Sequence, residues 1–145
     1  MTLRPASPTD APRLAAIDAC WDTTPRWTEE QFRKEASDTK AVAFVAEAGG
    51  TVAGFAAGWV VGEELQIFDV AVDPAFTRRG IGRALLSAAL AEGARRGATS
   101  AHLEVAEGNA PAAALYTGAG FKVVARRPKF YGGRTDALAM SRPLP

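Results

Sequence analysis

Neither sign of charge dominates this chain, and it contains a single cysteine and a single histidine. Its 17 lysines and arginines are balanced by 16 aspartates and glutamates. Because this balance creates no overall basic field, we expect no nucleic-acid partner, and any anion site must be local. The basic residues Arg126, Arg127 and Lys129 are interpreted as solvated loop charges. One cysteine, Cys20, excludes an internal disulfide.

Long apolar segments are missing as well. The longest runs, such as AVAFVA and FAAGWVVG, are far shorter than the roughly 20 residues that a membrane helix needs. Residues 1–14 contain no apolar core of a signal peptide. We therefore expect a cytoplasmic protein with no membrane partner. The 145 residues suit one domain, 1–145, and no repeat or low-complexity linker divides it. Nothing in the sequence indicates an oligomeric state.

Turn residues and apolar periodicity divide the chain into strands and helices. Gly49-Gly50 is a strong tight-turn signal and predicts a hairpin between the apolar runs on its two sides. The predicted strands span residues 2–6, 42–48, 51–61, 64–72, 99–106, 122–127 and 136–142. The predicted helices span residues 7–20, a short segment opened by a capping box of Thr28 and Gln31, residues 80–97 and residues 109–120.

The helix predicted from Gly80 lies between two strands, and a crossover of this length makes those strands parallel. The turns elsewhere favour antiparallel pairing. We therefore predict an α/β (α+β) fold with a mixed, mostly antiparallel central sheet of about six to seven strands, flanked by about four helices.

Two glycines and three arginines crowd the start of this helix, in the segment RRGIGRA. Glycines at a helix N-terminus expose backbone N–H groups at the positive end of the helix dipole, and arginines add charge-assisted hydrogen bonds, so the segment favours phosphate. A P-loop would need Lys and then Ser or Thr after Gly82, where Arg83-Ala84 stands. A dinucleotide fingerprint would need a third glycine at Leu85. Both are excluded, and a surface turn with solvated arginines is the simple alternative.

Arg79, Gly82 and Ala84 match in order the pattern of Gln or Arg, two residues, Gly, one residue, then Gly or Ala. With VAVDP before it, the segment resembles the acyl-CoA loop of the GNAT acetyltransferase superfamily. The resemblance implies acetyl-CoA as co-substrate, in a reaction that requires no metal. It implies that the pantetheine arm is held by the backbone of Val70, Ala71 and Val72. It implies that the phosphates are held by Arg78, Arg79, Gly80, Ile81, Gly82, Arg83 and Ala84.

A second segment, LEVAEGNAPAAALYTGAGF, resembles the part of GNAT enzymes that contacts coenzyme A with an Asn and places a Tyr near the thioester. Asn109 and Tyr116 match those positions. Asn109 is also a good N-cap for the predicted helix, and Tyr116 could be an ordinary core aromatic. The ordered set LEV, N, ALY, GF, FYGG and DALAM is similar to the branch that acetylates the N-terminal alanine of a small-subunit ribosomal protein.

In that branch the Glu of LEV is the general base and the Tyr of ALY the general acid, roles that the resemblance transfers to Glu104 and Tyr116. A carboxylate suits the reaction because an N-terminal ammonium has a pKa of roughly 7.7 to 8.0 and needs little help to lose its proton. The implied partner is a protein N-terminus, such as that of a ribosomal protein. The sequence departs from that branch in two ways that bear on peptide specificity. Ala106 stands where the branch usually has Arg, and the tail around residues 127–136 is shorter than in the branch. A small amine as acceptor, or a noncatalytic acyl-CoA-binding module, is the alternative.

Other residues compete for roles in this site. Asp69 interrupts an otherwise apolar strand, so we expect it to face the acceptor amine or else to cap backbone N–H groups at a bulge. His102 shares a strand face with Glu104 and is an alternative base; Glu104 itself could be an ordinary solvated strand residue. The resemblance implies that Tyr131, in KFYGG, contacts the incoming peptide N-terminus; a surface aromatic of a hairpin is the alternative. Cys20 is expected to be a packed, inert thiol.

Overall fold

The computed structural model describes residues 1–21, 27–131 and 135–145, with the backbone alone for residues 129–131 and 135. The strands are β1 (Thr2–Pro5), β2 (Ala41–Ala48), β3 (Thr51–Val61), β4 (Glu64–Val72), β5 (Ser100–Ala106), β6 (Lys122–Tyr131) and β7 (Thr135–Pro143). The helices are α1 (Ala11–Asp18), α2 (Glu29–Ser37), α3 (Ile81–Arg95) and α4 (Ala110–Gly118), with the 3-10 turns η1 (Pro8–Asp10) and η2 (Pro74–Phe76). Within these ranges no helix is long and apolar enough to cross a membrane.

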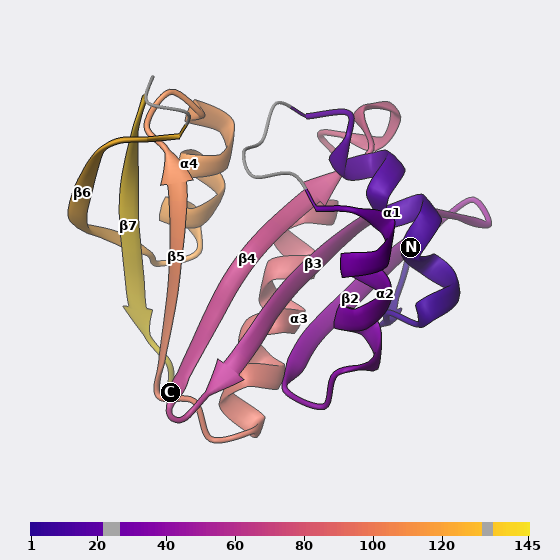
Figure 1. Cartoon of the computed structure of the whole chain (residues 1–145), viewed down its shortest axis with the longest axis horizontal. Coiled ribbons are helices and arrows are strands. Elements are labelled where there is room, and N and C mark those ends of the chain that lie inside the picture. Colours follow the sequence, from indigo (N-terminus) through magenta and orange to yellow (C-terminus); the bar gives the residue numbers. More distant parts are fainter. Residues whose placement is uncertain (22–26, 132–134) are drawn as a thin grey trace.

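The strands form one seven-stranded sheet in the order β1-β2-β3-β4-β5-β7-β6 (Figure 1). β4 and β5 are parallel, and α3 lies in the connection between them, as predicted. The other neighbouring strands pair antiparallel. Helices α1 and α2 cover one face of the sheet, and α3 and α4 cover the other. The predicted fold class is confirmed.

The helix starts follow local signals in the sequence. The side chain of Thr28 accepts from the N–H of Gln31 at 3.1 Å, and the side chain of Gln31 accepts from the N–H of Thr28 at 2.7 Å, so the predicted capping box opens α2. Gly80 caps α3 with a φ of 77°, a left-handed conformation that glycine adopts without strain. The helix predicted over residues 7–20 starts later, after η1, because Pro12 has no N–H to bond the carbonyl four residues before it.

The last two strands are longer than predicted. They extend forward to Tyr131 and back to Thr135, which pair with each other. β6 includes Pro128, which an edge strand tolerates because no outer neighbour needs its N–H. Arg126 and Arg127, interpreted from the sequence as loop charges, therefore lie in this strand, and both are ion-paired.

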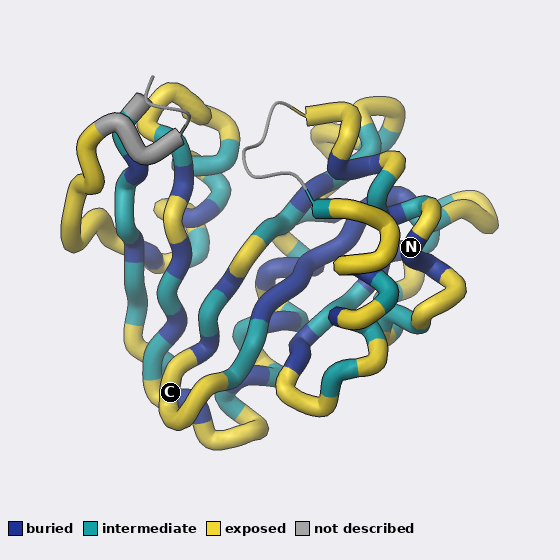
Figure 2. The backbone as a smooth tube through the Cα atoms, viewed as in Figure 1, coloured by how far each residue is buried: buried dark blue, intermediate teal, exposed yellow. Residues whose placement is uncertain are grey.

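Two layers of apolar side chains hold the helices on the sheet. The core under α3 and α4 includes Leu65, Leu85 and Phe121, and the core under α1 and α2 includes Phe32 and Phe55. β3 runs between the two layers and is buried over most of its length (Figure 2). Burial of one large apolar side chain contributes about 1.5 to 3 kcal/mol. These contacts fix α1 and α3 against the central strands, which carry the candidate site.

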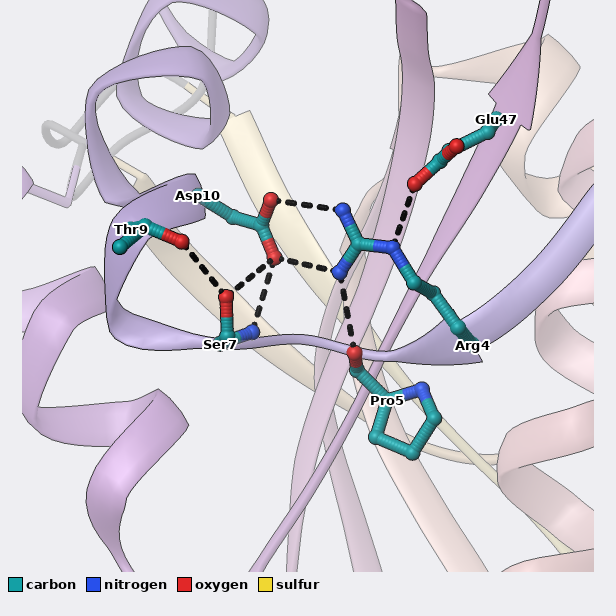
Figure 3. Close-up of polar contacts among 6 residues, drawn as sticks. All are labelled: Arg4, Pro5, Ser7, Thr9, Asp10 and Glu47. Carbon is teal, nitrogen blue, oxygen red and sulfur yellow. Dashed lines mark hydrogen bonds and ion pairs between the residues drawn. The ribbon is translucent and has the colours of Figure 1, made fainter. Parts of the chain in front are cut away.

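An ion cluster fixes the N-terminal strand to the start of α1 (Figure 3). The Arg4 guanidinium donates to both carboxylate oxygens of Asp10, at 2.8 and 2.9 Å, and its Nε donates to Glu47 on β2. Asp10 also accepts from the N–H of Ser7 at 2.8 Å. Hydrogen bonding to Arg4 lowers the pKa of Asp10, although burial opposes the shift. The cluster therefore orients α1 relative to the sheet.

Cys20 differs from its prediction. It follows the end of α1 and is exposed rather than packed. Its Sγ donates to the carbonyl of Ala16 at 3.3 Å. Because α1 ends at Asp18, the thiol lies beyond the apolar face that packs on the sheet.

Candidate active site

β4 and β5 separate after three paired positions. Their parallel register runs from Glu64 and Ser100 to Gln66 and His102, and beyond this point the strands diverge (Figure 1). A pocket of about 360 Å³ lies between them. It is lined by Gln66, Ile67, Phe68, His102, Leu103, Glu104, Val124, Ala139 and Met140. Among the residues that the structure describes, no strand therefore pairs with the β5 side of β4 after Gln66.

A bulge in β4 shapes one wall of this pocket. The register with β3 shifts so that Gly58 pairs with Ile67 while the residue before Gly58 pairs with Asp69, which leaves Phe68 as an extra residue. A bulge of this kind places neighbouring side chains on one face, where strict alternation would separate them. Gly58 permits the close approach, since a Cβ there would lie 2.4 Å from the carbonyl oxygen of Gln66.

Glu104 projects from β5 into the pocket. Leu103 and Val105 are buried in the core under α3, so alternation along the strand directs Glu104 to the opposite face. Its Oε1 accepts from Nη1 of Arg127 at 2.6 Å. The Glu104 side chain is 33 % exposed. A partly exposed carboxylate at this point can take a proton directly or through one water.

Tyr116 lies on the other side of the sheet. It belongs to α4, is 6 % exposed and packs in the core that includes α3. Its ring meets that of Phe121 edge-on, with 6.0 Å between the ring centroids. Glu104 and Tyr116 therefore occupy opposite faces of the sheet. Such a placement suits a reaction in which the acceptor arrives on one face and the leaving group departs on the other.

The start of α3 exposes backbone N–H groups that make no hydrogen bond within the described part of the chain. Arg78 has a φ of 64° and Gly80 a φ of 77°, so two left-handed residues precede the helix. The N–H of Ala84 donates to the carbonyl of Gly80 at 3.1 Å, which is the first hydrogen bond of the helix. Among the described residues, none accepts a hydrogen bond from the N–H groups of residues 81–83. Left-handed residues before a helix N-terminus form a typical anion-binding concavity.

Gly82 has no steric reason to be glycine. A Cβ there would contact Leu115 and Val72 at 3.6 and 3.7 Å, which are ordinary van der Waals distances. Internal packing would therefore accept a side chain at this position. Glycine instead lets a ligand reach the backbone amides closely, which fits the pyrophosphate of coenzyme A.

Three arginines flank these amides in the sequence. The Arg79 guanidinium lies 5.2 Å from the centroid of the Phe76 ring, a cation–π contact. The Arg83 guanidinium lies against the C-terminal end of α4, because a Cβ at Gly118 would be 2.9 Å from its Nη2. Arg78 is exposed. Three arginines carried by the segment that exposes these amides are consistent with a diphosphate ligand.

The β4 backbone expected to hold the pantetheine arm is partly engaged. Val70, Ala71 and Val72 pair with β3 on one side. Trp21, which follows α1, donates its indole N–H to the carbonyl of Val72 at 2.9 Å, a contact that sequence reasoning missed. In the described part of the chain no strand pairs with the edge that faces β5 here, and such an edge fits an extended ligand.

Asp69 meets a second carboxyl group. Its side chain is hydrogen-bonded to that of Asp18, which is 2 % exposed. Burial, reinforced by Asp18, raises the pKa of Asp69 well above its usual value, against the smaller effect of the Val70 N–H. Asp18 also accepts from the N–H of Trp27 at 3.2 Å. Asp69 follows Phe68 at the pocket but does not itself line it, and it joins β4 to α1.

The remaining predicted residues are placed as follows. Asn109 caps α4, its Oδ1 accepting from the N–H of Ala112 at 3.3 Å. His102 lines the pocket, and its Nε2 shares a hydrogen bond of 2.8 Å with the Ser100 hydroxyl. The side chain of Tyr131 lies outside the described residues. In the described part of the chain, no three His, Cys, Asp or Glu side chains gather in a way that could hold a metal ion.

Comparison with known proteins decides the family. The sequence profile of the acetyltransferase (GNAT) family matches residues 9–121. The chain belongs to the GNAT family. The resemblance found in the sequence is therefore confirmed, and this GNAT chain is an acetyltransferase that uses acetyl-CoA.

Relatives of this GNAT chain match it over nearly its full length. It is 35 % identical over 146 residues to the ribosomal protein bS18-alanine N-acetyltransferase of Escherichia coli K12, covering 99 % of this chain and 97 % of the relative. It is 34 % identical over 139 residues to the N-alpha-acetyltransferase RimI of Mycobacterium tuberculosis, covering 92 % and 86 %. The crystal structure of the ribosomal-protein-S18-alanine N-acetyltransferase from Escherichia coli superposes with a TM-score of 0.89 at 34 % identity, covering 99 % and 93 %.

Besides the Trp21 contact, sequence reasoning missed two further contacts at this GNAT site. The ion pair between Arg127 and Glu104 depends on strand order, which no local pattern indicates. The contact of Asp18 with Asp69 had a usable signal, because Asp18 stands four residues after the buried Leu14 and so falls on the packed face of its helix.

Proposed function

We propose that this protein transfers acetyl from acetyl-CoA to a protein N-terminal α-amine, with an N-terminal alanine of a ribosomal protein as the acceptor class. The observation that carries the proposal is Glu104, a carboxylate in the pocket where β4 and β5 diverge, on the face opposite Tyr116. The full-length similarity to enzymes named for N-terminal acetylation supports the acceptor class.

In the proposed reaction Glu104 accepts the proton that the acceptor's ammonium group must lose, directly or through water, so that the neutral amine nitrogen can bond to the acetyl carbon. The bound acetyl-CoA supplies an activated acetyl thioester. As the carbon–sulfur bond breaks, the Tyr116 hydroxyl gives a proton to the departing thiolate. The bonded nitrogen loses its second surplus proton to water, and solvent returns a proton to Tyr116. Backbone N–H groups of β4 around Val70 to Val72 stabilise the negative charge on the carbonyl oxygen.

The rim of the pocket favours a peptide over a small polar amine. Phe68 is 45 % exposed and Val124 is 64 % exposed, and both line the pocket. Exposed large apolar side chains at a binding site are typical of surfaces that meet a partner chain. A peptide can cover these side chains beyond its reactive amine, whereas a polyamine or an amino acid leaves them in water.

The acceptor class is tested by incubating the protein with acetyl-CoA and matched peptides that begin with Ala, Ser, Met or Lys, then weighing the products. A peptide that is already N-acetylated but carries an internal lysine is the control for side-chain acetylation. We expect acetylation of the free Ala peptide and none of the blocked peptide. Faster turnover of small amines than of every peptide would contradict the acceptor class and favour the small-amine alternative.

The catalytic roles are tested by Glu104→Gln and Tyr116→Phe, two variants of nearly unchanged shape. General acid–base groups typically contribute about 10²- to 10⁴-fold, so each variant should lower kcat by about 10²-fold or more. Acetyl-CoA binding, measured by calorimetry, should persist in both. If both variants acetylate as fast as the parent, these residues are not the acid and base. If the parent binds acetyl-CoA without turnover of any acceptor, the noncatalytic alternative holds.

A further inference from the structure

Glu104 is held by a residue from the far edge of the sheet. Its Oε1 accepts from Nη1 of Arg127 at 2.6 Å, and the side chains are 33 % and 53 % exposed respectively. Arg127 belongs to β6, and β7 stands between β6 and β5. The guanidinium therefore reaches across a whole strand to contact the carboxylate in the pocket.

Two alanines leave room for this reach. Ala137 on β7 pairs with both Arg127 and Ala106, and Ala139 pairs with both Glu104 and Ala125. Residues directly opposite one another on paired strands share a face of the sheet. Arg127 and Glu104 are thus on one face, separated only by methyl side chains. Larger residues on β7 would stand in the path of the guanidinium.

Stability alone does not explain the pair. Exposed ion pairs typically stabilise a fold by little. Arg126, the adjacent residue, makes pairs of the same surface kind with Glu107 and Asp136, outside the pocket. Arg127 differs from it because its partner is the pocket carboxylate.

We propose that Arg127 is a positioning residue for acetyl transfer. By binding Oε1 it fixes the Glu104 side chain, so that Oε2, which has no partner among the described residues, faces the acceptor's amine proton. An unrestrained carboxylate on a strand samples several rotamers, and most of them point away from the acceptor. This inference rests on the proposed function, because it requires Glu104 to be the base.

The test compares kcat and KM for the acceptor peptide and for acetyl-CoA in five variants. They are Glu104→Gln, Arg127→Gln, Arg127→Lys, Arg126→Gln and the double variant Glu104→Gln with Arg127→Gln. Arg127→Gln should lower kcat by about tenfold, because misplaced catalytic groups cost rate, with KM for acetyl-CoA unchanged. Arg127→Lys should recover part of the loss, since an ammonium can still bind Oε1. Arg126→Gln, the matched control, should leave kcat within about twofold of the parent.

The double variant decides whether Arg127 acts through Glu104. If it does, Arg127→Gln has no further effect once Glu104 is Gln. Independent, multiplicative losses would overturn the inference and assign Arg127 to another step, such as peptide contact. Equal kcat losses for the Arg126 and Arg127 variants would also overturn it. If Glu104→Gln keeps full activity, Glu104 is not the base and the proposed mechanism is refuted. If Glu104→Gln lowers kcat but Arg127→Gln does not, only the positioning role of Arg127 is refuted.

Discussion

Asp69 at the β4 bulge and Asp18 at the end of α1 share a hydrogen bond between their carboxyl groups. One of the two must carry the proton that makes this bond, and burial favours the protonated form of Asp69. The pair fixes the end of α1 to the strand that forms the pocket wall. Asp69 therefore has a structural duty besides the acceptor contact expected from the sequence.

Two substitutions of Asp69 separate these duties. Asp69→Asn keeps a side-chain N–H that can donate to Asp18, so its free energy of unfolding should stay within about 1 kcal/mol of the parent. Asp69→Ala leaves Asp18 buried without its partner and should lose about 1 to 3 kcal/mol. If Asp69 also contacts the acceptor, both variants should raise KM for the peptide, and KM for acetyl-CoA should not change. An unchanged peptide KM in both would remove Asp69 from the acceptor site.

Local chemistry in the sequence was sufficient to predict most of the strands and helices, and it indicated the candidate cofactor loop, whose role stays a prediction. The capping box of Thr28 and the glycine at position 80 mark helix starts through contacts within a few residues. A bulge beside Asp69 was one of two alternatives offered by the sequence, and the structure contains it; the left-handed Arg78 and the reach of Arg127 over β7 were not predicted. The reach of Arg127 depends on strand order and register, which are set by residues far apart in the sequence.

Gly82→Ala should weaken acetyl-CoA binding without harming the fold. The new Cβ would make only ordinary contacts with Leu115 and Val72, and alanine favours a helix over glycine by about 1 kcal/mol, so the free energy of unfolding should rise or stay the same. A Cβ beside the bare amides would hold the pyrophosphate away from them, and we expect a roughly tenfold higher Kd, equivalent to about 1.4 kcal/mol. Calorimetry measures the affinity.

Ser87→Ala, on the exposed side of the same helix, is the control for Gly82→Ala and should not change the Kd. If Gly82→Ala binds acetyl-CoA as tightly as the parent does, the phosphates do not lie on this helix start.

Gly58→Ala should disturb the pocket through the bulge. The new Cβ would lie 2.4 Å from the carbonyl oxygen of Gln66, a backbone atom that cannot move without shifting β4. We expect a loss of about 1 to 3 kcal/mol in the free energy of unfolding, typical of overpacking. Since Gln66 and Phe68 line the pocket, KM for the acceptor should rise. Urea unfolding and steady-state kinetics measure the two effects.

The control for Gly58→Ala is Gly108→Ala, whose Cβ would have no atom within 4 Å. It should unfold at the same urea concentration as the parent, to within about 0.5 kcal/mol. Equal stability of the two variants would mean that the bulge adapts to a side chain at Gly58.

Glu35 on α2 gives the fold a dependence on pH near neutrality. Glu35 is 5 % exposed. Its Oε1 accepts a hydrogen bond from the indole N–H of Trp59, and its Oε2 has no partner among the described residues. Burial raises its pKa to about 7, which the Trp59 hydrogen bond only partly offsets. The folded protein therefore keeps a proton on Glu35 that the unfolded chain releases near its ordinary value of 4.5.

A folded state that binds more protons loses stability as pH rises. The stability that Glu35 contributes should begin to fall near pH 4.5, its pKa in the unfolded chain, and the fall should level off above about pH 7, its pKa in the folded protein. Glu35→Gln keeps an acceptor for Trp59 and cannot ionise, so it should match the parent at pH 5 and exceed its free energy of unfolding at pH 8 by about 1 kcal/mol, a value discounted for solvent screening. Urea unfolding at both pH values measures the difference. Glu30→Gln, exposed on the same helix, controls for the lost charge; if its pH response equals that of Glu35→Gln, burial of Glu35 is not the cause.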